Sequence, residues 1–207
     1  MKKNISLLLF ILISNSIFSQ IKDDTYFSNP IIADSLSSLM IPIQFDFGIL
    51  NSSKLSGTDY YSNILFYNFL QDSTKRLFNN DTYIKGFKKE NYYYNRDKEE
   101  KPDNITSKWI FYFVKSNDYN KNGKIDNDDP YTLFVSDKNG NALKSLTPQN
   151  ENAVSIHIYE KQGFALIKMQ RDLDKDEDFE SDDKDFYYLR LNLNSLTLEK
   201  KIEKSQL

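Results

Sequence analysis

The chain has 207 residues, 39% of them hydrophobic and 14% aromatic, which is enough to build one ordinary domain around a buried core. Its net charge is −3, from 27 basic and 30 acidic residues mixed along most of the sequence, and this argues against a nucleic-acid partner, because such proteins usually carry a basic face. The absence of cysteine excludes disulfides, thiolate metal sites and a cysteine nucleophile.

The first nineteen residues have the order of a secretory signal peptide. Two lysines, Lys2 and Lys3, precede an apolar run over 7–13, and the small residues Ser14, Ser16 and Ser19 follow. The apolar run is shorter than the roughly 20 residues that a transmembrane helix needs, although an uncleaved N-terminal anchor is the alternative. We therefore expect an exported protein, cleaved near Ser19, whose mature chain 20–207 is one β-rich domain without a membrane span. Its place would be the periplasm, the outer surface or the medium.

Residues 28–39 are compatible with a brief helix. From about Pro42 onward, short segments alternate between apolar and polar residues with the period of half-buried strands. Turn residues at 138–141 and 161–163 indicate hairpins between such strands. The sequence thus predicts an all-β fold with strands over 41–47, 63–69, 108–114, 131–135, 154–159, 164–169 and 186–193. From the alternation we expect a core that contains Phe111, Phe113, Leu133, Val135, Leu166 and Tyr188.

The chain also repeats itself at a spacing of 54 residues. Asp118 falls on Asp172 at this shift, and the same order of apolar strand, acidic loop, aromatic strand and turn surrounds both. Repeats of this length built from hairpins suggest propeller blades or a related stacked-sheet unit. We expect two to three antiparallel hairpin or blade-like units over about 42–98, 105–150 and 151–204, in a propeller-like or sandwich arrangement. Closed propellers typically need four to eight blades, which is more than this chain can supply.

One segment, 131–148, carries a local resemblance to a known repeat. It has a strand ending in Ser136-Asp137, a turn at Gly140 and a second strand closing in Leu146-Thr147. This order resembles a blade of the TolB-like propeller repeat, and the resemblance implies a blade-like hairpin here.

The segment 118–129 has the residue pattern of a loop that wraps a calcium ion. Calcium takes six to eight oxygen ligands, and a twelve-residue loop supplies them from positions 1, 3, 5, 7, 9 and 12, with the carbonyl used at position 7. Gly123 stands at position 6, where the loop turns sharply, and Ile125 at position 8 would tether the loop to the core. The expected ligands are Asp118, Asn120, Asn122, Lys124, Asp126 and Asp129.

The segment 172–183 repeats this pattern with more acidic residues. Phe179 stands at the tether position, but Glu177 replaces the glycine at position 6, where a positive φ is uncommon for other residues. The expected ligands are Asp172, Asp174, Asp176, Asp178, Glu180 and Asp183. The alternative for 118–129 is a solvated, Asn- and Asp-rich hairpin loop, and the alternative for 172–183 is a solvated acidic surface run.

Both loops resemble the calcium loops of the EF-hand and dockerin type, and the first ends in Asp129 as dockerin loops end in Asp. The resemblance implies calcium as the bound ion. The flanking segments alternate as strands, however, and a helix-opening calcium switch needs a pair of helices. We therefore expect calcium to be structural, closing an acidic connection between two strands.

No catalytic constellation stands out elsewhere. The single histidine, His157, lies between two isoleucines in an alternating segment, which predicts an exposed strand position. Residues 92–94 are three tyrosines that could stack on a sugar, or could form one strand with alternating rings. The leading interpretation is a non-enzymatic, calcium-binding module at the cell envelope, with a protein or glycan as partner. A carboxylate-based, carbohydrate-active hydrolase and a dockerin-like adhesion partner are the alternatives.

Overall fold

The structure is a computed structural model that describes residues 24–31, 37–46, 60–87, 104–126, 128–179 and 183–204. The expected signal peptide over 1–19 and the three tyrosines at 92–94 lie outside the described residues.

The described chain is all-β, as the alternating pattern predicted, and forms two antiparallel sheets. The larger sheet has the order β1-β2-β3-β5-β6-β7-β8, with β4 paired to β3, and the smaller has the order β12-β11-β10-β9. The strands of the larger sheet are β1 Asp24–Phe27, β2 Ser38–Asp46, β3 Tyr60–Asn68, β4 Ser73–Arg76, β5 Tyr83–Lys85, β6 Trp109–Lys115, β7 Thr132–Asp137 and β8 Lys144–Ser145. Those of the smaller sheet are β9 Asn152–Tyr159, β10 Phe164–Arg171, β11 Asp185–Asn192 and β12 Thr197–Ile202, with a 3-10 turn at Glu160–Gln162.

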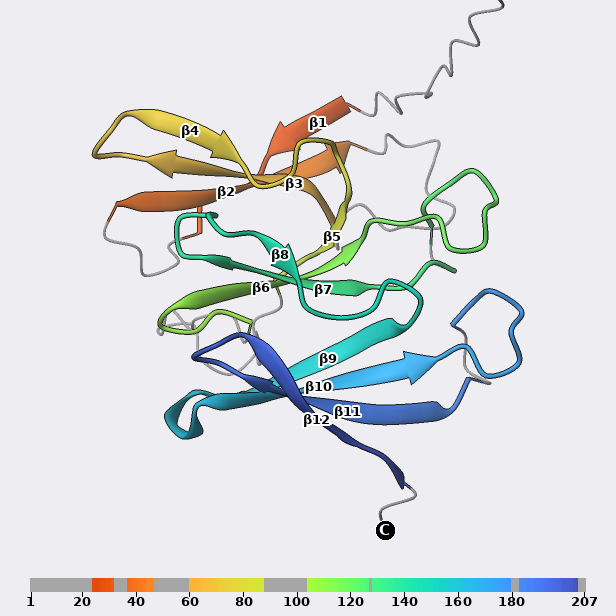
Figure 1. The fold of residues 1–207 in the computed structure, drawn as a ribbon. Coiled ribbons are helices and arrows are strands. Elements are labelled where there is room, and N and C mark those ends of the chain that lie inside the picture. Colours follow the sequence, from red (N-terminus) through yellow and green to blue (C-terminus); the bar gives the residue numbers. More distant parts are fainter. Residues whose placement is uncertain are drawn as a thin grey trace, which may run out of the picture.

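The strands lie in three layers, with β1 to β4 in the first, β6 to β8 in the second and β9 to β12 in the third (Figure 1). The short strand β5 links the first two layers, pairing at two positions with β3 and at two positions with β6. Two hydrogen bonds join the second and third layers. The indole nitrogen of Trp109 donates to the carbonyl of Leu193, and the Ala153 amide donates to the carbonyl of Tyr131.

Two hydrophobic clusters fill the spaces between the layers, and β6 contributes to both. Alternate residues of a strand point to opposite faces. Phe111 of β6 packs with Leu133 and Val135 against residues of the smaller sheet, while Ile110, Tyr112 and Val114 pack against β2, β3 and β5. The hairpin β6–β7 is therefore the central element of the molecule, with both faces covered.

All seven predicted strands are present, with ends that differ by a few residues. The expected core is confirmed for Phe111, Leu133 and Val135, which are fully buried, and Phe113 packs half-buried on the same cluster. It is wrong for Leu166 and Tyr188, which are half-buried, because their neighbours Ile167 and Tyr187 point into the core instead. Apolar side chains occupy both faces of these two strands, so alternation alone could not select the buried face.

The two predicted turns are confirmed. Gly140 in the β7–β8 turn has φ +73°, and a Cβ there would lie 2.5 Å from the ring of Phe66 on β3, so the turn needs glycine for both conformation and space. Gly163 ends the 3-10 turn with φ +74°. The expected brief helix over 28–39 is wrong at both described ends, because Ile31 forms a bridge to Met40 and β2 begins at Ser38.

Within the described residues neither sheet closes on itself, and the propeller-like arrangement of repeated blades stays a prediction. In the part of the chain that the structure describes, no helix has the length and apolar character required to cross a membrane.

Candidate metal centre

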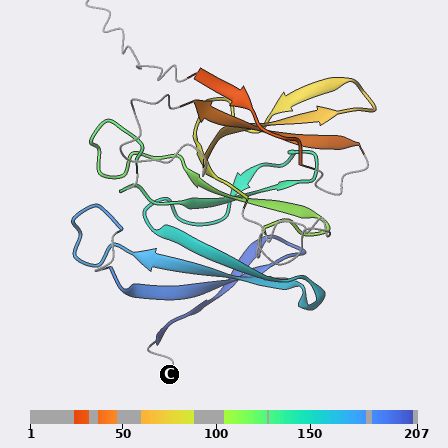
Figure 2. The ribbon, with the colours of Figure 1, turned by 180° about the vertical axis from the view of Figure 1, so that it is seen from behind.

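The two acidic segments lie side by side at one end of the molecule, although they belong to different sheets. The segment 118–129 connects β6 to β7 in the larger sheet, and 172–183 connects β10 to β11 in the smaller one. We call them the first loop and the second loop. Views from opposite sides show them adjacent (Figures 1 and 2). Both are flanked by strands, as the sequence predicted.

In the first loop, side-chain oxygens accept bonds from backbone amides of the same loop. Asp118 at position 1 accepts from the Gly123 amide at 2.9 Å, and Asn120 at position 3 accepts from Asn122 at 3.1 Å. Asn122 at position 5 accepts from the Lys124 amide at 2.9 Å. Asp129 at position 12 accepts from the Tyr119 amide at 2.7 Å, which closes the loop.

The second loop has the same four bonds at positions shifted by 54 residues. Asp172 accepts from the Glu177 amide at 3.2 Å, Asp174 from Asp176 at 3.4 Å, and Asp176 from Asp178 at 3.3 Å. Asp183 closes the loop by accepting from the Leu173 amide at 2.6 Å. The sequence repeat is thus also a repeat of local structure.

The backbone conformation repeats as well. Positions 4 and 6 have positive φ in both loops: +58° at Lys121 and +83° at Gly123, then +65° at Lys175 and +68° at Glu177. Glu177 therefore takes the glycine conformation without being glycine, at a cost of about 1–2 kcal/mol. The second loop is bent in the same way as the first, in spite of the substitution that made it less regular in sequence.

Four carboxylates of the second loop form a compact cluster. One oxygen from each of Asp172, Asp174, Asp176 and Asp183 lies within 4.8 Å of the others. Like charges at this spacing repel one another, and the pKa of Asp176 is raised, first by desolvation and further by the nearby charges of Asp174 and Asp178. In the first loop the corresponding cluster holds two carboxylates, since positions 3 and 5 are asparagines.

The donor set suits a hard cation. Carboxylate and amide oxygens are the ligands that Ca²⁺ and Mg²⁺ prefer, and neither loop offers nitrogen or sulfur ligands that would favour zinc or copper. Four such oxygens lie together in the described part of the second loop, where they could hold a metal ion.

The last residue of each loop is anchored in the interior, a feature that the sequence interpretation missed. Asp129 and Asp183 are only 2% and 3% exposed. The Lys115 ammonium donates to the Asp129 carbonyl at 2.5 Å, and the Gln170 amide donates to the Asp183 carbonyl at 2.9 Å. Burial lowers the pKa of Lys115 to about 8, against the opposing effect of Asp129. In the sequence, these anchors are indicated only by a polar residue near the C-terminal end of the apolar strand that precedes each loop, Lys115 in β6 and Gln170 in β10.

The remaining predicted ligands have mixed outcomes. Asp126 accepts from the Asp128 amide at 3.2 Å and so belongs to the first loop's network. Lys124 and Asp178 stand at position 7 and were expected to use their backbone carbonyls. In each loop, the backbone amide of this residue donates a hydrogen bond to the side chain at position 5. Glu180 lies outside the described residues. Phe179, expected to tether its loop to the core, instead packs on the ring of Tyr119 in the first loop, with centroids 5.5 Å apart.

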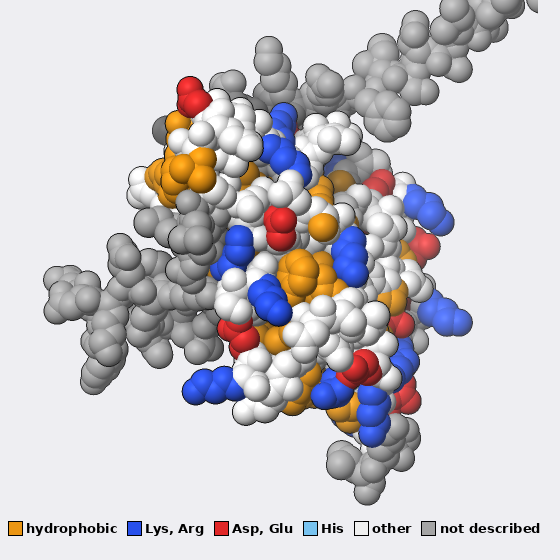
Figure 3. Space-filling model, turned by 60° about the vertical axis from the view of Figure 1, so that its left-hand side comes forward, with side chains coloured by type: hydrophobic (Ala, Val, Ile, Leu, Met, Phe, Trp, Pro, Cys, Tyr) orange, Lys and Arg blue, Asp and Glu red, His pale blue; other side chains and the backbone are white. Residues whose placement is uncertain are grey.

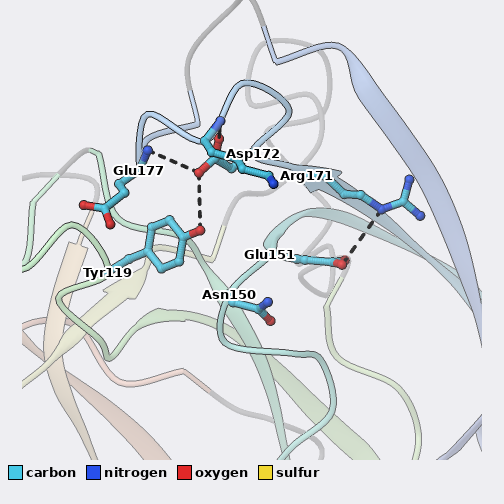
Figure 4. Close-up of a pocket in the computed structure, with 7 residues that line it drawn as sticks. Tyr119, Asn150, Glu151, Arg171, Asp172 and Glu177 are labelled. Carbon is cyan, nitrogen blue, oxygen red and sulfur yellow. Dashed lines mark hydrogen bonds and ion pairs between the residues drawn. The ribbon is translucent and has the colours of Figure 1, made fainter.

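A polar pocket of about 330 Å³ opens beside the second loop (Figure 4). Arg171 on its wall is held by Asp185 at 2.6 Å and Glu203 at 2.7 Å, and lies 3.9 Å from Glu151. Among the described residues of the wall, Glu151 is the one acid outside the loops and Tyr119 is the one aromatic. The lining residues are Tyr119, Asn150, Glu151, Arg171, Asp172, Lys175 and Glu177.

Elsewhere, charged groups of both signs are interspersed. On the face shown in Figure 3, basic and acidic side chains alternate with small separate groups of hydrophobic ones. The single histidine, His157, is exposed on β9 as its position between two isoleucines predicted.

No protein-family model matches the chain, and a comparison with curated proteins finds no match. The resemblance to EF-hand and dockerin loops therefore rests on the residues and geometry described above.

Proposed function

We propose that this chain is an exported, non-enzymatic all-β protein that binds one calcium ion in each of the two loops, with calcium in a structural role. The observation that carries the proposal is the cluster of four aspartates in the second loop, at the loop positions that supply calcium ligands. The matched bonds and φ angles of the first loop support a second site of the same kind.

The role of the ion follows from where the loops stand. Each loop connects two antiparallel strands, and its last residue is anchored in the interior by Lys115 or Gln170. An ion that joins position 1 to position 12 ties the end of one strand to the start of the next. Because it binds the folded loop and not the unfolded chain, it stabilises the fold by mass action.

We further propose that the module acts at the cell envelope, where calcium is available at the concentrations that such loops need, with a protein or glycan as its partner. The motivation for export is the order of residues over 1–19. The 54-residue repeat of loop structure supports the interpretation of 105–150 and 151–204 as two copies of one hairpin unit.

A hydrolase would need two acids facing a cleft outside the ion loops. The pocket beside the second loop does not favour that alternative, since two of its three acids, Asp172 and Glu177, belong to the loop. The dockerin-like alternative has helices beside its loops, and here strands flank both.

The test is a calorimetric calcium titration of the protein lacking residues 1–19, with a matched pair of variants. Asp176→Asn removes a carboxylate that faces the cluster, and we expect it to weaken the second site about tenfold, a loss of about 1.4 kcal/mol. Asp178→Asn removes the same charge two residues away, where the expected ligand is the backbone carbonyl, and should change the affinity by less than about threefold.

Equal losses in the two variants would show that net charge, and not ligation, attracts the ion. Absence of binding heat and of any change in melting temperature at millimolar calcium would overturn the proposal for both loops. A parallel titration with magnesium, expected to bind more weakly, tests the identity of the ion.

A further inference from the structure

Tyr119 belongs to the first loop, but its side chain lies against the second. Its backbone amide donates to Asp129 at 2.7 Å and so closes its own loop. Its hydroxyl donates to Oδ2 of Asp172 at 3.3 Å, and its ring packs on Phe179 with centroids 5.5 Å apart. Figure 4 shows the hydroxyl directed at the Asp172 carboxylate. A single residue thus contacts the closing carboxylate of one loop and the opening carboxylate of the other.

The repeat supplies an internal comparison. The residue equivalent to Tyr119 in the second loop is Leu173, whose amide makes the same closing bond to Asp183 at 2.6 Å. The Leu173 side chain is 60% exposed. The closing hydrogen bond from the amide at position 2 is therefore common to both loops, whereas, of the two described side chains at this position, that of Tyr119 is the one that contacts the neighbouring loop. The second loop shows that a loop of this kind closes without such a side-chain contact from position 2.

The contact also decides which oxygen of Asp172 is available to an ion. Oδ2 accepts from both the Glu177 amide and the Tyr119 hydroxyl, and a carboxylate oxygen has two lone pairs. Oδ1 accepts one bond, from the Lys175 amide at 2.6 Å. With both lone pairs of Oδ2 engaged, the carboxylate is held in one orientation and Oδ1 retains the capacity to ligate.

We propose that Tyr119 is a positioning residue that couples the two ion sites, so that an ion in the first loop strengthens binding in the second. This inference rests on the proposed calcium binding. An ion in the first loop restrains Asp129. The hydrogen bond from the Tyr119 amide to the Asp129 carboxylate then restrains Tyr119 as well. The hydroxyl and ring of Tyr119 then hold Asp172 and Phe179 in place, which lowers the ordering cost of filling the second loop. Thermodynamic linkage requires the same factor in the opposite direction.

We expect a coupling of about fivefold, at the lower end of typical values, because the contact between the loops is half-exposed. The experiment is a calcium titration of the second loop with and without a working first loop, in three backgrounds at position 119. Asp118→Ala disables the first loop and should weaken the second about fivefold when Tyr119 is present. In Tyr119→Leu, which installs the side chain of the equivalent position, Asp118→Ala should leave the second loop's affinity unchanged.

Tyr119→Phe keeps the ring contact with Phe179 and removes the hydroxyl, so its coupling should lie between the two. Leu173→Phe changes the exposed equivalent residue and serves as the matched control, with coupling equal to that of the parent protein. Should Asp118→Ala fail to fold, Asp118→Asn removes the charge while keeping an acceptor oxygen in place.

The inference is overturned if Asp118→Ala weakens the second loop equally in the Tyr119 and Tyr119→Leu backgrounds, or has no effect in either. Absence of binding in the parent protein is a different result, because it refutes the calcium proposal itself and this inference with it.

Discussion

Single residues decide which face of β10 is buried. Ala165, Ile167 and Met169 point into the core between the sheets, and Phe164 and Leu166 lie half-buried on the other face. The alternation identifies the strand. It does not identify the buried face, because a shift of one residue exchanges two sets of apolar side chains.

We expect Ile167→Ala to lower the free energy of unfolding by about 2–5 kcal/mol, since it leaves a cavity in a fully packed core. Leu166→Ala removes a side chain of the same size from the half-buried face and should cost about 1 kcal/mol, because less apolar area returns to water. Urea unfolding at one calcium concentration measures both. Equal losses would contradict the assignment of Ile167 to the buried face of β10 and of Leu166 to the half-buried face.

Tyr112 gives the fold a dependence on alkaline pH. Its side chain is fully buried between the first and second layers, with its hydroxyl 2.8 Å from that of Ser136, and burial raises the pKa of the phenol far above its ordinary value. The folded state then keeps a proton that the unfolded chain releases above about pH 10. The stability that this group contributes is present below pH 10 and is lost as the pH rises.

The expected slope for one such group is about 1.4 kcal/mol per pH unit. Tyr112→Phe should reduce the slope above pH 10 by up to this amount, and should cost about 1 kcal/mol at pH 7 through the lost hydrogen bond. Denaturant unfolding between pH 8 and 11 checks both effects. An unchanged slope in the variant would show that Tyr112 does not carry the linkage.

At the scale of the elements, the two loops share one conformation but differ in charge. The first carries four acids and two lysines, for a formal −2, and the second carries eight acids and one lysine, for a formal −7. Four carboxylates of the second loop are clustered, and repulsion among them opposes the closed conformation when no cation is present.

We therefore expect a chelator to expose the second loop to protease before the first. Cleavage products mapped by mass spectrometry should begin within 172–183, and millimolar calcium should suppress them. The first loop, with amides at positions 3 and 5, should stay closed longer but bind its ion more weakly, with a dissociation constant of about 10⁻⁴ to 10⁻³ M. Earlier cleavage in 118–129 would contradict the ranking by charge.

The elements also show where sequence reasoning reaches and where it stops. The long strands and both loops could be predicted because alternation and ligand spacing are local patterns. Strands β4 and β12 have uniformly exposed side chains, so they carry no alternating signal, and their place follows only from pairing with β3 and β11. The contact of Tyr119 with Asp172 joins two sheets, and no spacing within either loop encodes it.

At the scale of the whole molecule, ion binding should raise stability as calcium concentration rises. A ligand at 100 times its dissociation constant adds about 2.7 kcal/mol, so a site of about 10⁻⁴ M affinity gives this gain at about 10 mM calcium. For a chain of this size the shift in melting temperature is about 5–10 °C per site. Scanning calorimetry in chelator and in 10 mM calcium measures it, and Asp172→Asn should reduce the shift.

Seven of the twelve strands in the described residues, and their antiparallel pairing, were within reach of the sequence, but the division into sheets was not. Three residues, β5 Tyr83–Lys85, connect the first and second layers into one sheet, whereas β7 and β9 fall into separate sheets although their residues are close in the chain. Whether two layers form one sheet depends on a few backbone hydrogen bonds between segments far apart in the sequence, and the composition of those segments does not predict such bonds.

The central position of the β6–β7 hairpin has a consequence for how the chain behaves before it is folded. Segment 110–114 is Ile-Phe-Tyr-Phe-Val, uncharged and free of proline, and its two faces are covered by different layers. Until both layers have docked, the hairpin presents apolar side chains on two sides, with the composition typical of segments that aggregate as stacked strands. Under the proposed export, the chain would pass through this stage after crossing the membrane, so the segment that holds the finished molecule together would also be the one that most needs shielding before the layers dock.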